Sequence, residues 1–261
     1  MAERVDSGGK RFEGDVAVVS SGTVTVSVVL PVLNEEKVLR RSVETLREFL
    51  ITYLPYEWGI IIADNGSTDQ TLNIAQELMA EYENIETVYL SQRGRGRALK
   101  QAWIGNYADV LVYMDIDLST NLESLIPLVD AIVQDGFDLA VGSRLLSSSR
   151  VIDRSIKREV LSRGYVFLIK CLFFSGITDA QCGFKAISNK AANTLMPLIE
   201  DNAWFLDTEL LLLAERFGLK RKDIPIVWTD DPDSRVRIAN TVLEAVSYTH
   251  LRAHETEADL V

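Results

Sequence analysis

The sequence predicts an α/β fold in which a mostly parallel, Rossmann-like central sheet carries helices on both faces. Nearly continuous apolar runs of strand length alternate with longer segments of helical periodicity, a pattern typical of strands buried on both faces. The chain has 261 residues, of which 47% are hydrophobic, enough for one substantial core. We therefore expect a polar, Gly/Ser-rich leader over residues 1–22 and a single domain over residues 23–246.

The expected elements alternate in order along the chain. Apolar runs bounded by polar turns predict the strands, and apolar residues at helical spacing predict the helices. The turn Ser67-Thr68-Asp69 offers side chains that suit the start of the second helix. Strands are expected at residues 23–30, 58–63, 85–90, 110–114 and 137–141, and helices at residues 35–54, 68–82, 97–106 and 122–134.

Polar loops follow three of these strands. Residues 31–36 follow the first strand, residues 64–69 follow the second, and Asp115-Ile116-Asp117 follows the strand at 110–114. Because ligands of open parallel sheets bind beyond the carboxyl ends of the strands, these loops are expected to converge on one crevice.

Asp115 and Asp117 are the most informative pair in the chain. In a β run alternate side chains share one face, so both carboxylates would point the same way while Ile116 turns toward the core. Paired carboxylate oxygens suit Mg²⁺ or Mn²⁺, and an ion held there could bind the diphosphate of a nucleotide-sugar. An acidic turn that caps the next helix is the commoner origin of an isolated Asp-x-Asp, so other segments have to support the metal interpretation.

The loop after the second strand has a functional and a structural explanation. Asp64 could accept a hydrogen bond from a nucleotide base, with Gly66 allowing a tight turn of the backbone. Alternatively, the segment could cap a helix through Ser67 or Asp69.

Two further loops carry the same ambiguity. Asn34 and Glu35 could contact the ligand or stand in the first turn of a helix. The loop 92–97, with Arg95 between two glycines, could face phosphates or be a solvated charged turn.

Charge is unevenly distributed along the chain. The formal net charge is -11 and the sequence pI is about 4.8, which argues against nucleic acid as a partner because phosphate backbones bind basic surfaces. Between residues 144 and 170, however, seven cations stand against Asp153 and Glu159, and we expect this stretch to bind an anionic group. The cations are Arg144, Arg150, Arg154, Lys157, Arg158, Arg163 and Lys170.

His250 and His254 are the only histidines, so residues 1–246 contain no imidazole base or metal ligand. Proton transfer in that part of the chain has to use carboxylates or be unnecessary. Residues 247–256 also resemble a translated sequencing adaptor, and we expect residues 247–261 to be a non-native or disordered tail.

The remaining features concern location. Cys171 and Cys182 are too few for a disulfide framework, and no apolar run reaches the roughly 18 residues of a membrane span. We expect a cytoplasmic protein that is peripheral on the cytosolic face of a membrane. The apolar segment 165–177 follows the basic stretch. On a membrane surface, the basic stretch could contact anionic headgroups and the apolar segment could contact acyl chains. A buried helix with a charged first turn is the alternative.

Taken together, the motifs resemble a known enzyme family. The strand 26–30 leading into Pro31-Val32-Leu33-Asn34-Glu35-Glu36, followed by residues 64–69 and by Asp115-Ile116-Asp117, resembles the inverting glycosyltransferases of family 2, which have the GT-A fold. The resemblance covers residues 24–246. Residues 142–144, 157–164 and 179–185 are similar to the polyprenyl-phosphate branch, and residues 179–185 and 204–209 are more similar to its dolichyl-phosphate glucosyltransferases.

The resemblance and the loops together assign candidate roles. Metal ligands would be Asp115, Asp117 and Ser119, and Arg144 and Arg235 would contact phosphates. The family often has an aromatic residue in place of Leu33, a second aspartate in place of Asn65 and a glutamine in place of Ser119. The nucleotide-sugar would lie against Pro31, Leu33, Asn34, Glu35, Ile62, Asp64, Asn65, Arg95, Asp115, Ile116, Asp117 and Arg235.

A lipid phosphate acceptor would explain the missing imidazole. A phosphate monoester, with a second pKa of about 6, is largely dianionic at neutral pH and needs no base. The expected reaction transfers a hexose, with glucose and UDP-glucose favoured, to polyprenyl or dolichyl phosphate with inversion. Asp115, Asp117, Arg144 and Arg163 would be catalytic, and the acceptor phosphate would lie against Arg144, Arg154, Arg158 and Arg163.

Three other interpretations stay open. The same fold could glycosylate a sugar hydroxyl in polysaccharide or glycan synthesis, with Asp207 or Glu209 as the base or as a contact to the sugar. It could act as a dolichyl-phosphate mannosyltransferase on GDP-mannose. It could also be a nucleotide-sugar-binding or membrane-docking module without catalysis.

Overall fold

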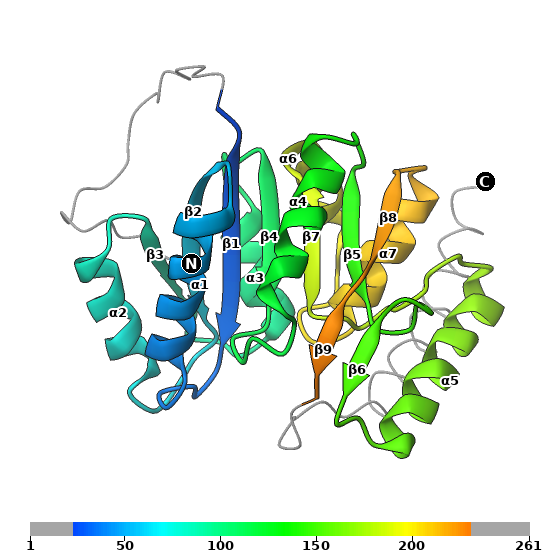
Figure 1. Ribbon diagram of the computed structural model, residues 1–261, viewed down its shortest axis with the longest axis horizontal. Coiled ribbons are helices and arrows are strands. Elements are labelled where there is room, and N and C mark those ends of the chain that lie inside the picture. Colours follow the sequence, from blue (N-terminus) through cyan, green and yellow to red (C-terminus); the bar gives the residue numbers. More distant parts are fainter. Residues whose placement is uncertain (1–22, 231–261) are drawn as a thin grey trace, which may run out of the picture.

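The computed structural model describes residues 23–230. The expected leader at residues 1–22, Arg235 and the expected tail at residues 247–261 lie outside the described residues. Seven strands form a sheet in the order β3-β2-β1-β4-β7-β5-β8 (Figure 1). They are β1 (Thr25–Val32), β2 (Glu57–Asp64), β3 (Ile85–Tyr89), β4 (Val110–Met114), β5 (Leu139–Ser143), β7 (Phe184–Ser188) and β8 (Arg221–Pro225).

Most of the sheet is parallel, which confirms the predicted fold class. β1 pairs in parallel with β2 and β4, β2 with β3, and β5 with β8. Only β7 is antiparallel, to β4 on one side and β5 on the other. The loops after β1, β2 and β4 therefore leave the same edge of the sheet, which is the lower edge in Figure 1.

Helices cover both faces of the sheet, and each face has its own core. One apolar cluster contains residues of α1 (Leu39–Tyr53), α2 (Thr71–Glu81) and α4 (Leu125–Val133). The other contains residues of α3 (Arg95–Trp103), α5 (Ile156–Phe173), α6 (Asn189–Leu195) and α7 (Leu206–Arg216). Along β1, Val28 faces the first cluster and Val29 the second, as the alternation of a doubly covered strand requires.

The first expected helix begins later than predicted, at Leu39. Residues 33–38 form the turn before it, where Asn34 has a φ of 55°. The backbone N–H of Asn34 donates to Ser67 Oγ at 2.9 Å, and that of Glu35 donates to Thr71 Oγ1 at 2.8 Å. These long-range bonds hold the loops after β1 and β2 together, and local sequence periodicity does not report them.

The carboxyl-terminal half contains elements that the apolar pattern did not reveal. Strands β7 and β8 complete the sheet, and β6 (Arg150–Ile152) pairs in parallel with β9 (Val227–Thr229) in a separate two-stranded sheet. This small sheet lies beside α5 in Figure 1. None of the helices between residues 23 and 230 is long and apolar enough to cross a bilayer.

Candidate active site

Several of the residues that the sequence singled out line one pocket at the carboxyl edge of the sheet. We call it the central pocket. It is lined by Arg95, Asp115, Asp117, Ser119, Arg144, Arg154, Arg158, Ser162, Gln181, Trp204, Asp207, Trp228 and Asp230.

Asp115 and Asp117 both line this pocket, although the predicted reason was wrong. β4 ends at Met114, so the two aspartates lie in a turn, closed by a hydrogen bond from Leu118 N to Asp115 O at 3.3 Å. Ile116 packs into the core, as predicted. A Cβ at Gly183 would collide with the Asp115 carboxylate, so glycine at that position leaves the room that Asp115 occupies.

The acidic pair fits a divalent ion that a substrate helps to bind. No group of three or more His, Cys, Asp and Glu side chains that could hold an ion occurs among residues 23–230. Mg²⁺ is commonly held by only one or two carboxylates together with substrate phosphates and water. Asp115, Asp117 and the hydroxyl of Ser119 supply hard oxygen donors of this kind, and Ser119 N already orients Asp117 through a 2.9 Å bond to Oδ1.

Arg95 links the acidic pair to the far side of the pocket. Its guanidinium forms ion pairs with Asp115 and with Asp207, the latter at 3.3 Å. It also lies over the rings of Trp204 and Tyr113, at 4.7 and 5.4 Å from their centroids. Burial would lower the pKa of Arg95, but the two carboxylates outweigh it and raise the pKa, so the guanidinium stays charged.

The glycines beside Arg95 allow the close approach that these contacts need. A Cβ at Gly94 would stand 2.5 Å from Asn202 O, and one at Gly96 would stand 2.9 Å from Asn202 C. The N–H of Gly94 donates to Asn65 Oδ1 at 2.5 Å, so Asn65 fixes the start of this loop. Residues 94–96 are therefore packed against the site, whereas Gln92 and Arg93 of the same loop are exposed.

Asp207 is a largely buried residue at the wall of the central pocket, and three donors bind its carboxylate. It accepts hydrogen bonds from Tyr113 OH, from Lys185 Nζ at 2.7 Å and from Arg95. Burial raises the pKa of Asp207 to about 7, with the charge of Arg95 opposing the shift. Burial lowers the pKa of Lys185 to about 8, with Asp179 among the charges that oppose the shift. Asp207 thus orders the cations around it.

Glu209, the other candidate base, lies outside the lining of the central pocket. Its fully buried carboxylate accepts the backbone N–H groups of Glu200 and Asp201 at 3.1 and 2.9 Å. Glu209 therefore holds the segment that precedes α7.

Three of the four predicted acceptor arginines line the central pocket. Arg144 forms a two-pronged ion pair with Asp179, at 2.8 and 2.9 Å. Arg158 pairs with Asp230 at 2.6 Å. The side chain of Arg163 is 61% exposed and bonded to Glu159, on the outside of α5.

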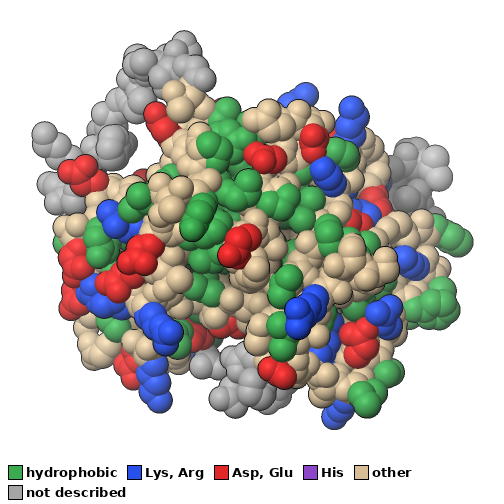
Figure 2. Space-filling model, in the orientation of Figure 1, with side chains coloured by type: hydrophobic (Ala, Val, Ile, Leu, Met, Phe, Trp, Pro, Cys, Tyr) green, Lys and Arg blue, Asp and Glu red, His purple; other side chains and the backbone are tan. Residues whose placement is uncertain are grey.

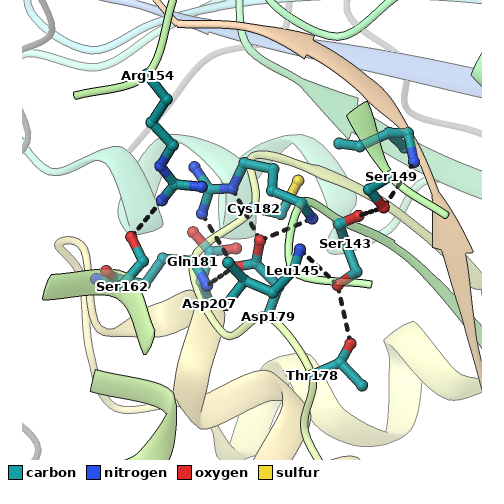
Figure 3. A network of polar contacts seen from close by, with 12 residues as sticks. Ser143, Leu145, Ser149, Arg154, Ser162, Thr178, Asp179, Gln181, Cys182 and Asp207 are labelled. Atoms are coloured by element: carbon teal, nitrogen blue, oxygen red, sulfur yellow. Dashed lines mark hydrogen bonds and ion pairs between the residues drawn. The ribbon is translucent and has the colours of Figure 1, made fainter. Parts of the chain in front are cut away.

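Arg154 is the most deeply buried cation of this group. Its side chain is 7% exposed, and it donates to Ser162 Oγ (Figure 3). Among the described residues, its Nε has no hydrogen-bond partner. Burial, followed by the neighbouring charge of Arg144, lowers the pKa of Arg154. A buried guanidinium with an unused donor at a pocket wall is suited to receive an anion.

Asp64 has a matching unused acceptor at the end of β2. The residue is fully buried, and Oδ1 accepts Ser67 N at 2.8 Å. Oδ2 is buried with no hydrogen-bond partner in the described part of the chain. Burial raises the pKa of Asp64, with the hydrogen bonds from Ser67 opposing the shift. An imide or amide N–H of a nucleotide base would satisfy this oxygen.

The other predicted nucleotide contacts have mixed placements. Pro31, Leu33 and Glu35 are half-buried at the carboxyl end of β1. Ile62 is fully buried in the core, so its side chain has no free surface for a ligand. Asn34 joins the first two loops, because its Oδ1 accepts Thr68 N at 2.8 Å.

Sequence reasoning did not assign several residues of the central pocket. Trp228 lies beneath the guanidinium of Arg144, 5.0 Å from the ring centroid. Gln181 and Trp204 stand in the motifs that carried the family resemblance, which was the only signal for them. Asp230 follows β9 and gave no signal of its own.

The comparisons with known proteins agree with this site. The chain belongs to glycosyl transferase family 2, whose sequence profile matches residues 27–196. It is 38% identical over 237 residues to glycosyltransferase AglD of Haloferax volcanii, covering 90% of this chain and 38% of that protein. It is 30% identical over 234 residues to the dolichyl-phosphate beta-glucosyltransferase of Saccharomyces cerevisiae, covering 83% of this chain and 70% of that protein. The chain thus spans less than half the length of AglD.

Solved structures show the GT-A fold. Glucosyl-3-phosphoglycerate synthase from Mycobacterium tuberculosis, in complex with Mn²⁺, UDP-glucose and phosphoglyceric acid, matches with a TM-score of 0.63 at 17% identity. The match covers 92% of this chain and 85% of that structure. The family and the fold together make the chain a glycosyltransferase.

Proposed function

We propose that the protein transfers a hexose, with glucose favoured, from a nucleoside-diphosphate sugar to a polyprenyl or dolichyl phosphate with inversion. The observation that carries this proposal is the composition of the central pocket. It holds the acidic pair and four arginines on one surface, while Asp207 at its wall is paired with Lys185 and Arg95, and Glu209 holds backbone N–H groups outside the pocket. The similarity to the yeast dolichyl-phosphate beta-glucosyltransferase supports the same substrate class.

The donor would lie along the edge from Asp64 to Asp115. Asp64 Oδ2 is covered, so it would accept a base N–H once the loops after β1 and β2 move apart. Asp115, Asp117 and Ser119 would hold Mg²⁺ or Mn²⁺ at the diphosphate. The ion, when bound, would neutralise charge that develops on the leaving diphosphate. Arg95 lies beside Asp115 and could share that charge. Mn²⁺ and UDP in the mycobacterial synthase structures support this choice of ion and nucleotide.

The acceptor phosphate would lie against Arg144, Arg154 and Arg158. Its dianion carries its own lone pair, so the chain has to orient it and exclude water but not to remove a proton. Attack opposite the leaving diphosphate would invert the anomeric centre. We do not retain Arg163 as an acceptor contact, because its guanidinium lies outside this pocket.

A sugar-hydroxyl acceptor fits the structure less well. That reaction needs a base with a free lone pair near the acidic pair. Asp207 accepts from three donors, and both oxygens of Glu209 accept backbone N–H groups. A phosphate acceptor requires neither carboxylate as a base.

The protein would meet its lipid acceptor at a membrane surface through α5. Ile156, Val160 and Phe167 follow one another at helical spacing along α5 and are 84%, 63% and 69% exposed. Phe174, which caps the helix in a left-handed conformation, is 95% exposed. Apolar side chains and cations protrude along this edge of the molecule in Figure 2. The same helix carries Arg158 and Ser162 in the central pocket, so a bilayer on its outer face would bring headgroups to the arginines. We propose peripheral attachment on the cytosolic face.

The direct test offers the protein a choice of acceptors. It is incubated with Mg²⁺ or Mn²⁺, a panel of UDP- and GDP-sugars, and either a short polyprenyl phosphate or an alkyl glucoside, and the products are analysed by mass spectrometry. We expect glycosyl lipid with UDP-glucose and none with the variant Asp117→Ala. Product on the alkyl glucoside alone would support the hydroxyl-acceptor reaction, and no product with any donor would overturn the proposal.

A further inference from the structure

We propose that Trp204 is the wall against which the hexose of the donor packs. The inference rests on the proposed function, because it requires a nucleotide-sugar in the central pocket. Trp204 lines that pocket together with Asp115 and Asp117, yet the residue is 38% exposed. A large apolar ring left open at a polar site is suited to the apolar C–H face of a sugar ring.

The position of Trp204 matches the place where a hexose has to lie. Arg95 touches Asp115 on one side and lies 4.7 Å from the Trp204 ring centroid on the other. A diphosphate held at the acidic pair would therefore place its attached sugar within reach of the indole. The acceptor arginines line the same pocket, so a hexose against Trp204 would also be open to attack from their side.

The segment that carries Trp204 is fixed more firmly than an ordinary surface turn. Residues 200–206 form what we call the tryptophan loop. Glu209 accepts the N–H groups of Glu200 and Asp201, and Asp201 Oδ1 accepts those of Ala203 and Leu206 at 2.7 and 2.9 Å.

The loop 92–97 holds the tryptophan loop from its other side. Gly96 N donates to Ala203 O and Arg97 N donates to Asn202 O, both at 3.2 Å. The side chain of Lys100 adds bonds to Ile199 O at 2.6 Å and to Asn202 Oδ1 at 3.2 Å. Because the backbone that carries the ring is already ordered, a ligand that packs on Trp204 has little loop freedom left to restrict, which favours a binding role.

The simplest competing role for Trp204 is to shield Arg95. Such a shield would affect every ligand that depends on Arg95, whether or not it carries a sugar. A sugar wall would affect only ligands that carry the hexose. The two roles therefore differ in how they change the affinities for UDP and for UDP-glucose.

The experiment measures both affinities by titration calorimetry with Mn²⁺ in the full chain. For Trp204→Ala we expect UDP-glucose to bind about fivefold or more weakly and UDP to bind as before, and for Trp204→Phe a smaller loss confined to UDP-glucose. Tyr107→Ala removes an 89% exposed aromatic residue that does not line the pocket and should change neither affinity.

Each other result has a defined meaning. Equal losses for UDP and UDP-glucose in Trp204→Phe, with an unchanged melting temperature, would assign the ring to Arg95 and overturn the inference. Unchanged affinities in both variants would overturn it as well. If the wild-type chain binds UDP but gains nothing from the glucose, the inference fails while the proposed function stands on the acceptor assay.

Discussion

At the scale of single residues, we expect a substitution of Asp64 to weaken ligand binding without lowering the melting temperature. Its unused Oδ2 and its raised pKa mean that the native state binds a proton more readily than the unfolded chain. Stability therefore falls as the pH rises above the pKa of an aspartate in the unfolded chain, because the native state resists the loss of this proton. We expect Asp64→Asn to weaken UDP binding at least tenfold but to melt at the same or a higher temperature at pH 7, with the difference shrinking toward acid pH.

Asp69 is the matched control for Asp64. Although burial acts in the opposite direction, hydrogen bonds from Thr71 and Glu36 lower the pKa of Asp69 overall, so its charge stabilises the fold at neutral pH. Asp69→Asn should therefore lower the melting temperature at pH 7, and that loss should vanish in acid. Scanning calorimetry at several pH values checks both variants. If Asp64→Asn lowered the melting temperature at pH 7 as Asp69→Asn does, the unpaired oxygen of Asp64 would not be a source of instability.

Gly183 offers a second test at this scale. An alanine Cβ there would meet the carboxylate of Asp115 and displace it from the pocket. Gly183→Ala should weaken Mn²⁺-dependent UDP binding at least tenfold, as measured by calorimetry. Gly164→Ala, on α5 where a Cβ meets nothing within 4 Å, should leave binding intact and stabilise the helix by about 0.5 to 1 kcal/mol. Undiminished binding in Gly183→Ala would show that Asp115 is not a ligand.

At the scale of elements, the sequence predicted strands where both faces are apolar and failed where tertiary contacts decide. β1, β2 and β4 are buried along most of their length, so their apolar runs were plain. β8 is an edge strand in which only Ile224 is buried, and β7 contains Lys185, whose charge is accommodated by Asp207 in α7. A buried lysine in a strand makes sense only once its distant partner is in place.

α5 is the element whose exposed face makes a prediction. Phe167→Ser with Phe174→Ser should reduce sedimentation with vesicles that contain anionic lipid, because both rings are exposed, one on the helix and one at its cap, in a segment that also carries the exposed Lys170. Phe217→Ser, which removes a 49% exposed ring at the end of α7, should have no effect on sedimentation. Equal sedimentation of the double variant and the wild type would contradict the proposal that this helix binds a membrane.

At the scale of the whole molecule, the sequence identified charged residues that share one pocket, but it did not identify the partners with which they pair. Asp115, Arg144 and Arg158 were singled out from three separate segments and do share one pocket. Arg163 was grouped with Arg158 by sequence proximity, yet five residues along a helix turn the side chain away, whereas Ser162 keeps the face of Arg158. Contacts such as Arg158 with Asp230, which are 72 residues apart, leave no local trace in the sequence.

The proposed function divides the pocket into a donor side and an acceptor side, and Arg154 tests that division. Its buried guanidinium has an unpaired Nε, donates to Ser162 and forms an ion pair with Glu159 at 3.2 Å, but none with Asp115 or Asp117. Arg154→Met should raise the KM for polyprenyl phosphate at least tenfold while UDP affinity stays within twofold, and the melting temperature should hold because an incompletely paired buried charge is removed. Arg150→Gln, an exposed cation on β6, serves as the control and should alter neither quantity. A variant at Arg154 that lost UDP binding and acceptor binding together would mean that the two phosphates share one site, and the in-line arrangement of donor and acceptor would have to be abandoned.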